Sequence, residues 1–333
     1  MPLGIYTKKS IKILSWLGGE VSDYKCGVFH ANYYNSIEKS DFTENWDRII
    51  KILPRIDLVY LSQQPNNFSD GTANPVITIG GEIKQYAYAS KLTSNWQDYC
   101  SLKNGKTFSS LEKKFKKLSQ LGVLELKIAS NIEEINGVFQ ILVDQKTRKY
   151  NETKTSNLLC KPGIYSFYKN IVLKESQTGF CRLFYLKLDN LILATDFCLL
   201  YNNRLFSLMP SFQIEEYGKY SPGNVCLLLT LQWAIKNNVK VFDFTVGAEE
   251  HKKTWCEEEL KLYTYTHSLN FKGWLYHHKI KFIERLRRFR YFYKLRNHLL
   301  NKISTSKFLN FSFKNSKCYF ILPMLQYPEA FFF

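Results

Sequence analysis

The chain has 333 residues, of which 45% are hydrophobic and 23% charged, and its formal net charge is +17. The hydrophobic content predicts a sizeable core and excludes disorder over most of the length. The 8 cysteines form no CxxC pair and no Cys/His cluster with zinc-finger spacing, which excludes a zinc finger and indicates a reducing compartment. The positive charge fits nucleic acid, an anionic membrane, acidic substrates, or a drift of composition that involves no partner.

The N-terminal sequence carries no recognisable targeting signal. Residues 1–10 lack the apolar region of a signal peptide. No run of about 18 apolar residues occurs in the chain, so no transmembrane helix is expected. We therefore expect a cytoplasmic protein.

The first third of the chain predicts strands and helices in alternation. Strands are expected at residues 11–16 and 56–61, with a helix at 44–53 between them. Residues 94–122 predict a helical connector with one apolar stripe and lysines on its other face. We interpret the lysine face as solvated, with a nucleic-acid patch as the alternative.

The middle of the chain predicts a helix followed by a β-meander. Ser130 and Glu133 have the spacing of a capping box, which would open a helix that runs to about Tyr150. Arg148 lies in the last turns of that helix, where a cation suits the helix dipole. The other elements expected here are a strand at 123–128, a helix at 164–173, and strands at 179–188, 191–200 and 204–212.

Residues 217–255 contain a loop, a helix and a strand around which the rest of the chain is organised. The loop, 217–224, leads into a helix whose free amides and dipole suit a phosphate, and Lys219 adds positive charge. The Ser221 hydroxyl is a candidate cap for those amides. The alternative interpretation is an ordinary capped helix in an α/β domain.

The strand of this stretch is expected at residues 240–246. Asp243 lies on one face of it, where a carboxylate is costly unless it is paired. This position suggests either a functional group or a buried ion pair with Lys252 or Arg148.

The same stretch resembles the CelD-type, BioF-like branch of the GNAT acyltransferases, which neighbours the FemAB-type transferases. The chain departs from that pattern at Ala248 and His251. The N-terminal half is also similar through Ser22-Asp23-Tyr24, although a strand, a helix and a strand of the family precede the position of Pro2 and are missing here. The matching residues are Tyr220-Ser221-Pro222-Gly223, Phe242-Asp243-Phe244, Gly247, Glu249, Lys252 and Trp255.

The resemblance implies an α/β (α+β) acyl-CoA N-acyltransferase (GNAT) fold with two GNAT-like halves, the N-terminal one incomplete. A strand at 260–269 would close the sheet at its edge. A basic helix at 274–300 either docks on the domain or lies on an anionic membrane. The domains expected are a partial GNAT-like half at 1–95, a basic helical connector at 96–122, an acyltransferase domain at 123–270, and a basic helix with an apolar tail at 271–333.

The resemblance also implies a set of site residues. The expected cofactor is acetyl-CoA or another acyl-CoA, which acts as the donor substrate, and no metal is expected. The site residues are Asp243, Glu249 and Tyr220 for catalysis; Lys219, Ser221, Gly223 and Asn224 for the donor; and Arg148, Lys252 and His251 for the acceptor substrate.

These expectations describe a bacterial N- or O-acyltransferase that acts directly on an amine or hydroxyl of a cell-envelope sugar, lipid or amino compound. The expected partners are that small-molecule or glycan acceptor and, through residues 274–300, an anionic membrane surface; sequence-specific nucleic acid is not expected. The alternative is a non-catalytic GNAT-fold module that binds a membrane surface or anions.

Overall fold

The computed structural model divides the chain into two units, Met1–Trp274 and Leu275–Phe333, and each is described by itself. Among the described residues, no helix combines the length and the apolar character that crossing a membrane requires. The described residues are 1–30, 39–68, 71–103, 105–153, 156–213, 215–247, 252, 255–283 and 285–286.

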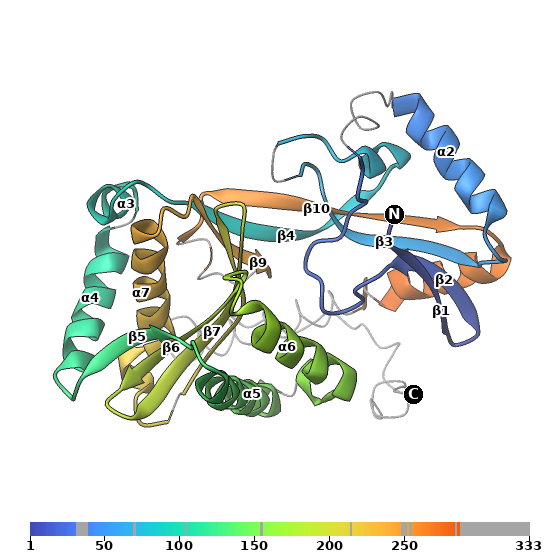
Figure 1. Cartoon of the computed structure of the whole chain (residues 1–333). Helices are drawn as coiled ribbons and strands as arrows, with labels where there is room; N and C mark the ends of the chain where they lie inside the picture. Colours follow the sequence, from blue (N-terminus) through green and yellow to red (C-terminus); the bar gives the residue numbers. More distant parts are fainter. Residues whose placement is uncertain are drawn as a thin grey trace, which may run out of the picture. The chain divides into compact units, whose positions relative to one another are not determined.

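In the described part of the first unit, ten strands form one sheet in the order β1-β2-β3-β10-β4-β9-β8-β7-β6-β5 (Figure 1). The sheet is mixed, since β2–β3 and β8–β9 pair in parallel and the other neighbours pair antiparallel. The strands are β1 (Leu3–Lys8), β2 (Ile11–Trp16), β3 (Leu58–Pro65), β4 (Glu82–Lys91), β5 (Leu124–Ile128), β6 (Cys181–Leu188), β7 (Leu191–Tyr201), β8 (Arg204–Phe212), β9 (Val241–Val246) and β10 (Glu258–Ser268).

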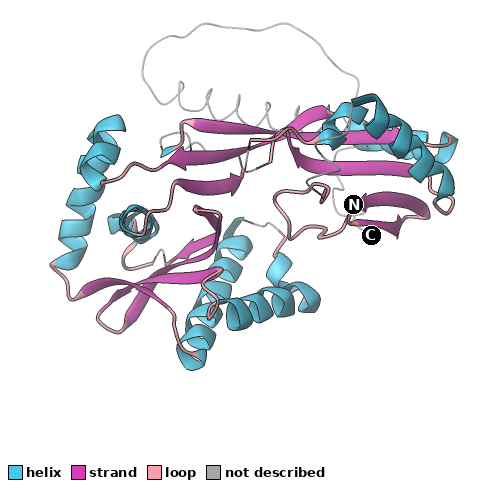
Figure 2. Cartoon of the chain, turned by 45° about the horizontal axis from the view of Figure 1, so that its top comes forward, coloured by secondary structure: helices cyan, strands magenta, loops and turns pink. Residues whose placement is uncertain are grey.

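Helices cover both faces of the C-terminal strands. The buried side chains alternate along β6: Phe184 packs with α7, whereas Leu183 and Tyr185 pack with α5 and α6. These helices lie on opposite faces of the strands (Figures 1 and 2). The helices and 3-10 turns are α2 (Lys39–Ile52), η1 (Pro75–Ile79), α3 (Trp96–Leu102), α4 (Gly105–Ser119), α5 (Ile132–Thr153), η2 (Leu158–Cys160), α6 (Pro162–Glu175), η3 (Gly218–Tyr220) and α7 (Pro222–Lys236).

The expected mixed α/β architecture is confirmed, and several elements fall where the sequence predicts them. β2 and β8 have the predicted bounds, and the C-terminal meander, helix and strand follow in the predicted order. The connector forms two helices, α3 and α4, and β1 and β4 were not predicted. The division of residues 1–270 into a half-domain, a connector and an acyltransferase domain stays a prediction.

The strand expected at the edge of the sheet lies inside it. β10 pairs with β3 on one side and with β4 on the other. Alternation along a strand reports which of its faces is covered, and it carries no information about how many neighbours the strand has. The prediction of an edge strand was therefore wrong.

The start of α5 is shifted by one residue from the predicted capping box. The amide of Glu134, not that of Glu133, is capped, by the Asn131 side chain at 2.9 Å. The Glu134 carboxylate reaches back to the amide and hydroxyl of Ser130 at 2.7 and 3.1 Å. Asn131 is also a favoured capping residue, so spacing alone did not distinguish the two registers.

Candidate functional site

The strands β8 and β9 separate after a short paired stretch. Their register ends at Phe206 and Asp243, although β8 continues to Phe212 and β9 to Val246. On its other edge, β8 carries an irregularity opposite Phe197 and Cys198. A β-bulge bends its strand and leaves backbone groups unpaired. We call the end of the β8–β9 pairing, at Phe206 and Asp243, the divergence point.

Asp243 is fully buried at the divergence point and accepts three hydrogen bonds. They come from the Tyr24 hydroxyl at 2.8 Å, the Arg204 Nε at 2.8 Å and the Thr245 amide at 2.7 Å. Burial raises the pKa of Asp243, and the Arg204 guanidinium acts against that rise. A carboxyl group that accepts this many hydrogen bonds holds its three donors in place.

The segment of residues 20–25 brings two further polar groups to the divergence point. Burial and the adjacent Asp243 charge raise the pKa of Tyr24 well above its usual value, so its phenol stays protonated. Its ring also packs edge-on against Phe206, with centroids 6.2 Å apart. The segment is held by the Lys25 amide, which donates to the Gln63 carbonyl at 3.0 Å.

Asp23 is a partly exposed carboxyl in the same cluster. Burial raises its pKa, while the nearby Thr245 side chain and the charge of Lys252 oppose that rise. Thr245 has φ +57°, a left-handed conformation that is strained for a β-branched residue. The Thr245 amide donates to Asp243 at 2.7 Å, and its hydroxyl donates to the Ser207 carbonyl at 3.5 Å, so Thr245 links β9 to the segment of β8 that leaves it.

Lys252 lies at the end of β9 with only 8% of its surface exposed. Its ammonium donates to the carbonyls of Phe244 and Val246 at 2.8 and 3.1 Å. It also acts electrostatically on Asp23. The site at the divergence point thus combines a carboxyl of raised pKa, a neutral phenol and a buried ammonium.

The predicted buried partner of Asp243 was wrong. Arg204, at the start of β8, forms that ion pair. Arg148 instead contacts the carboxylate of Glu215, in the loop that follows β8. The charge of Lys252 acts to lower the pKa of Asp23, but its hydrogen bonds go to backbone carbonyl oxygens and not to Asp243. Sequence spacing could not reveal the true pair. Arg204 on β8 and Asp243 on β9 lie 39 positions apart in the chain, and they meet only because β8 and β9 pair in parallel.

The turn from η3 into α7 holds the residues expected to bind the donor. Ser221 has φ +52° and its side chain does not cap the helix, contrary to expectation. Its hydroxyl accepts a hydrogen bond from Lys114 Nζ at 2.7 Å instead. Its carbonyl accepts from the amides of Asn224 and Val225 at 3.0 and 3.1 Å. The Lys114 ammonium therefore lies beside the first turn of α7.

The remaining predicted residues of this turn differ in their surroundings. The ammonium of Lys219 lies 5.1 Å from the centre of the Tyr220 ring, while Tyr220 packs in the apolar cluster between α4 and α7. Gly223 faces Phe212, and a Cβ at Gly223 would approach that ring to 2.6 Å. Asn224 is exposed. The structure thus places Tyr220 with the donor residues, away from the cluster around Asp243.

The described residues leave part of the expected site untested. Glu249 and His251, together with Ala248, lie outside the described residues. In the part of the chain that is described, no group of three or more His, Cys, Asp or Glu side chains is arranged to hold a metal ion.

Sequence reasoning missed Asp23, Tyr24, Arg204 and Lys114 as site residues. The signal for Asp23 and Tyr24 was the Ser22-Asp23-Tyr24 stretch, which was used only as a mark of resemblance. Lys114 was hidden in the lysine-rich face of α4, although it lies one turn from the buried Leu111 and Leu118.

A second buried carboxyl, Asp196 on β7, lies behind β8. The Ser207 hydroxyl donates to its Oδ2 at 2.8 Å, and Oδ1 has no oxygen or nitrogen partner among the described residues. Burial raises the pKa of Asp196 to about 7. Because Ser207 directly follows the divergence point, this carboxyl supports the segment of β8 that leaves β9.

Comparison with known proteins identifies the fold. Residues 105–253 match the model of a family described as "Acetyltransferase (GNAT) domain", and no curated protein matches the chain. Among solved structures, FemX has a TM-score of 0.53 at 9% identity, over 79% of this chain and 83% of that chain. The C-terminal domain of a proposed lysylphosphatidylglycerol synthetase from Agrobacterium fabrum has a TM-score of 0.50 at 10% identity, over 81% of each chain. The chain has the GNAT fold, and its matched region is similar to acetyltransferase domains.

Proposed function

We propose that the protein is an acyl-CoA-dependent N- or O-acyltransferase whose donor lies along the opening between β8 and β9. The observation that carries the proposal is the polar cluster at the divergence point, where Asp23 lies beside a buried network of Tyr24, Asp243 and Arg204. Polar groups of this kind are expensive in a sheet unless they serve a purpose. The match of residues 105–253 to acetyltransferase domains supports the same reaction class.

The phosphate end of the donor would lie at the turn from η3 to α7. Lys114 and Lys219 carry the charge there, and the Ser221 hydroxyl and the helix dipole add to it. From Phe206 to Phe212, β8 rises over six residue-to-residue steps, or about 20 Å at roughly 3.3 Å per step. An extended donor that starts at the turn would therefore place its thioester near the divergence point.

The transfer would proceed directly between the two substrates. The amine or hydroxyl of the acceptor attacks the thioester carbonyl as Asp23 takes its proton, and the carbon–sulfur bond then breaks. The proton passes to the leaving thiolate. Lys252 would balance the negative charge that develops on the oxygen or sulfur, and Asp243 would hold Tyr24 and Arg204 in position.

The acceptor we propose is an amine or hydroxyl of a cell-envelope sugar, lipid or amino compound. Arg148 would contact an acidic group on it, in exchange for Glu215. Glu249 and His251 remain candidates for catalysis and acceptor binding. We also propose a cytoplasmic location and a place in the CelD-type, BioF-like branch, for which the Ser22-Asp23-Tyr24 stretch is the support.

A second candidate donor is an aminoacyl-tRNA in place of acyl-CoA. The fold is shared with FemX and with a domain of a proposed lysylphosphatidylglycerol synthetase, and a net charge of +17 would suit a nucleic-acid donor. The third candidate is a GNAT-fold module that binds anions without transfer.

The test is isothermal titration of the protein with acetyl-CoA and with a long-chain acyl-CoA. The Lys114→Ala/Lys219→Ala variant should bind at least about tenfold more weakly, because hydrogen bonds to charged groups contribute roughly 1.5–3 kcal/mol each. Lys117→Ala, an exposed position on α4, is the control and should bind as the wild type does. Equal affinity in all three proteins would place the donor elsewhere. No binding by the folded wild type would favour the other two candidates.

A further inference from the structure

The helix that begins at residue 271 presents large apolar side chains to solvent. It continues to residue 283 and through residues 285–286. Five apolar residues along it recur at spacings of three, four and seven, which places them on one stripe of a helix. Their exposed fractions are Phe271 72%, Trp274 46%, Leu275 50%, Phe282 62% and Leu286 48%.

The first turn of this helix is fixed by specific contacts. The Asn270 side chain accepts from the Gly273 amide at 2.9 Å, which caps the helix, and donates to Asp57 Oδ1 at 2.9 Å. A Cβ at Gly273 would lie 1.9 Å from the Asp57 carbonyl oxygen, so only glycine permits this close approach. The direction of the aromatic side chains in this turn is therefore determined by the fold.

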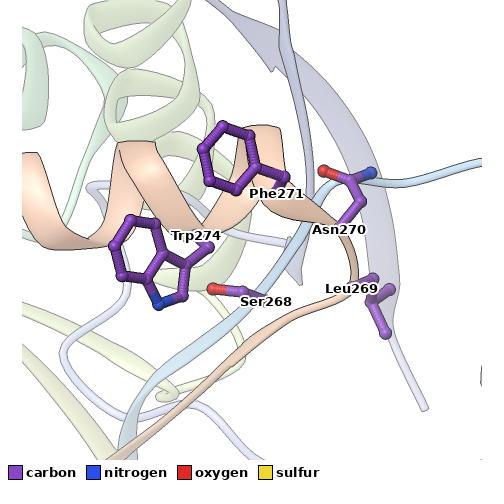
Figure 3. A pocket seen from close by; sticks show the side chains of 5 residues that line it. All are labelled: Ser268, Leu269, Asn270, Phe271 and Trp274. Atoms are coloured by element: carbon purple, nitrogen blue, oxygen red, sulfur yellow. The ribbon is translucent and has the colours of Figure 1, made fainter.

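Two of those aromatic side chains form a stacked pair. The Phe271 and Trp274 rings are nearly parallel, at 11°, with centroids 5.8 Å apart. Figure 3 shows both rings beside a shallow hollow that is also lined by Ser268, Leu269 and Asn270. The Ser268 hydroxyl is buried in this lining without a hydrogen-bond partner among the described residues. The surface is thus apolar with one unsatisfied polar group.

Basic side chains flank the apolar stripe on both sides. At about 100° per residue, Lys272 and Lys279 lie along one border of the stripe, and Lys281 and Arg285 lie on either side of Trp274 near the other. Long cationic side chains beside an apolar helix face reach up to anionic head groups while the apolar residues enter the bilayer boundary. Aromatic residues, and Trp above all, favour that boundary.

We infer that this stripe, Phe271 to Leu286 with its basic flanks, docks the protein on an anionic lipid bilayer. A second copy of the chain is a poorer occupant, because two such stripes would bring their cationic flanks together. Nucleic acid would use the cations but leave the aliphatic and aromatic residues in water. The inference is independent of the proposed transfer reaction, since no residue of the stripe belongs to the site at the divergence point.

The test is cosedimentation of the full chain with vesicles, without any acyl donor. Vesicles of phosphatidylcholine with about one-third phosphatidylglycerol should bind the protein, and pure phosphatidylcholine should bind it far more weakly. Binding should weaken between about 50 mM and about 500 mM salt, because the basic flanks are screened. Absence of binding to the anionic vesicles at low salt would overturn the inference.

Two variants separate the apolar and the cationic contributions. Phe271→Ala/Trp274→Ala should bind at least about tenfold more weakly, since burial of one such side chain contributes roughly that factor. Phe167→Ala/Tyr201→Ala, which removes exposed aromatic residues elsewhere, should bind as the wild type does.

Lys279→Glu/Arg285→Glu should weaken binding to anionic vesicles. Lys113→Glu/Lys117→Glu on α4 is the control and should retain most of the vesicle binding. Equal losses in both pairs would mean that net charge alone drives binding and would contradict the assigned stripe. Binding of duplex DNA as tightly as anionic vesicles, with no loss in Phe271→Ala/Trp274→Ala, would also overturn it. The inference would also be overturned if the wild type formed a dimer without binding vesicles and Phe271→Ala/Trp274→Ala abolished that dimer.

Discussion

Asp243 and Asp196 are two buried carboxyls in the same sheet with different surroundings. Asp243 receives three donors, one of them the Arg204 guanidinium, so both of its oxygens are satisfied. Asp196 receives the Ser207 hydroxyl on one oxygen, and burial raises its pKa to about 7. The first therefore holds its three donors in place, and the second is protonated below a pH of about 7.

The Asp196 carboxyl should make stability depend on pH. Its pKa is about 7 in the folded chain against 3.8 for an ordinary aspartate, so the folded state binds the extra proton between those values. The free energy of unfolding should fall as the pH rises through that range and level off above it. Asp196→Asn removes this loss and should be more stable than the wild type by several kcal/mol at about pH 8, with the difference vanishing near pH 4.

Urea denaturation of both proteins at a series of pH values measures this difference. Asp144→Asn, which changes an exposed carboxyl on α5, is the control and should follow the wild type. A stability difference between Asp196→Asn and the wild type that is independent of pH would contradict the assignment of a raised pKa to Asp196.

At the level of elements, the contact between α7 and β8 fixes the start of the helix. Gly223 lies so close to the Phe212 ring that a Cβ would approach to 2.6 Å. The ring in turn lies under the Lys149 ammonium, 5.8 Å from it. The glycine in this turn is therefore explained by packing, in addition to any approach of a phosphate.

Gly223→Ala should destabilise the chain by roughly 1–3 kcal/mol, because the added methyl overpacks against Phe212. Adding Phe212→Leu should recover part of that loss by removing the opposing ring. Chemical denaturation of the two variants and of Phe212→Leu alone gives the coupling between the positions. If the two changes were simply additive, the close approach would have no energetic consequence.

Elements with a self-contained pattern were predictable from the sequence. β8 largely alternates between buried and more open positions, and β2 is a short, mostly apolar run that ends before a pair of glycines. Both were found at their true bounds. β4 was missed because its first five residues are exposed and include the polar Glu82, Lys84 and Gln85, and buried positions begin only at Ala87. The place of β10 depends on which strands lie beside it, and no local pattern records this.

The site was predictable only in part, for a similar reason. Asp243 stood out because a carboxylate in a buried strand needs an explanation. Its hydrogen-bond donor Tyr24 is 219 positions away in the chain, and Lys114 lies 107 positions from Ser221. Such pairs arise from the topology of the sheet, so the residues could be noticed one by one but not assembled.

At the level of the first unit, strands from its N-terminal and C-terminal ends share one sheet. β10 returns from the C-terminal side to lie between β3 and β4, and β4 then pairs with β9. Residues 20–25 cross from the N-terminal strands to the divergence point. The N-terminal third is therefore part of the site and of the core beside it.

This arrangement predicts that residues 123–270 do not fold alone. In that fragment β9 loses its partner β4, and β10 loses both of its neighbours, which leaves long unpaired strand edges. Circular dichroism and dye binding should show a loosely packed state, and coexpression with residues 1–122 should restore cooperative unfolding. A fragment of residues 123–270 that unfolds cooperatively by itself would instead support a separate acyltransferase domain.

The most direct measurement for the proposed site is thiol release from acyl-CoA, with pooled amines and amino sugars as acceptors, by the wild type and Asp23→Asn. Loss of a general base should lower the rate roughly 10²- to 10⁴-fold, while titration shows acyl-CoA affinity unchanged. Glu20→Gln, in the same segment, should retain the rate. The wild-type rate should rise with pH through the raised pKa of Asp23. Equal thiol release by Asp23→Asn and the wild type would contradict the assignment of the base and the role of residues 20–25.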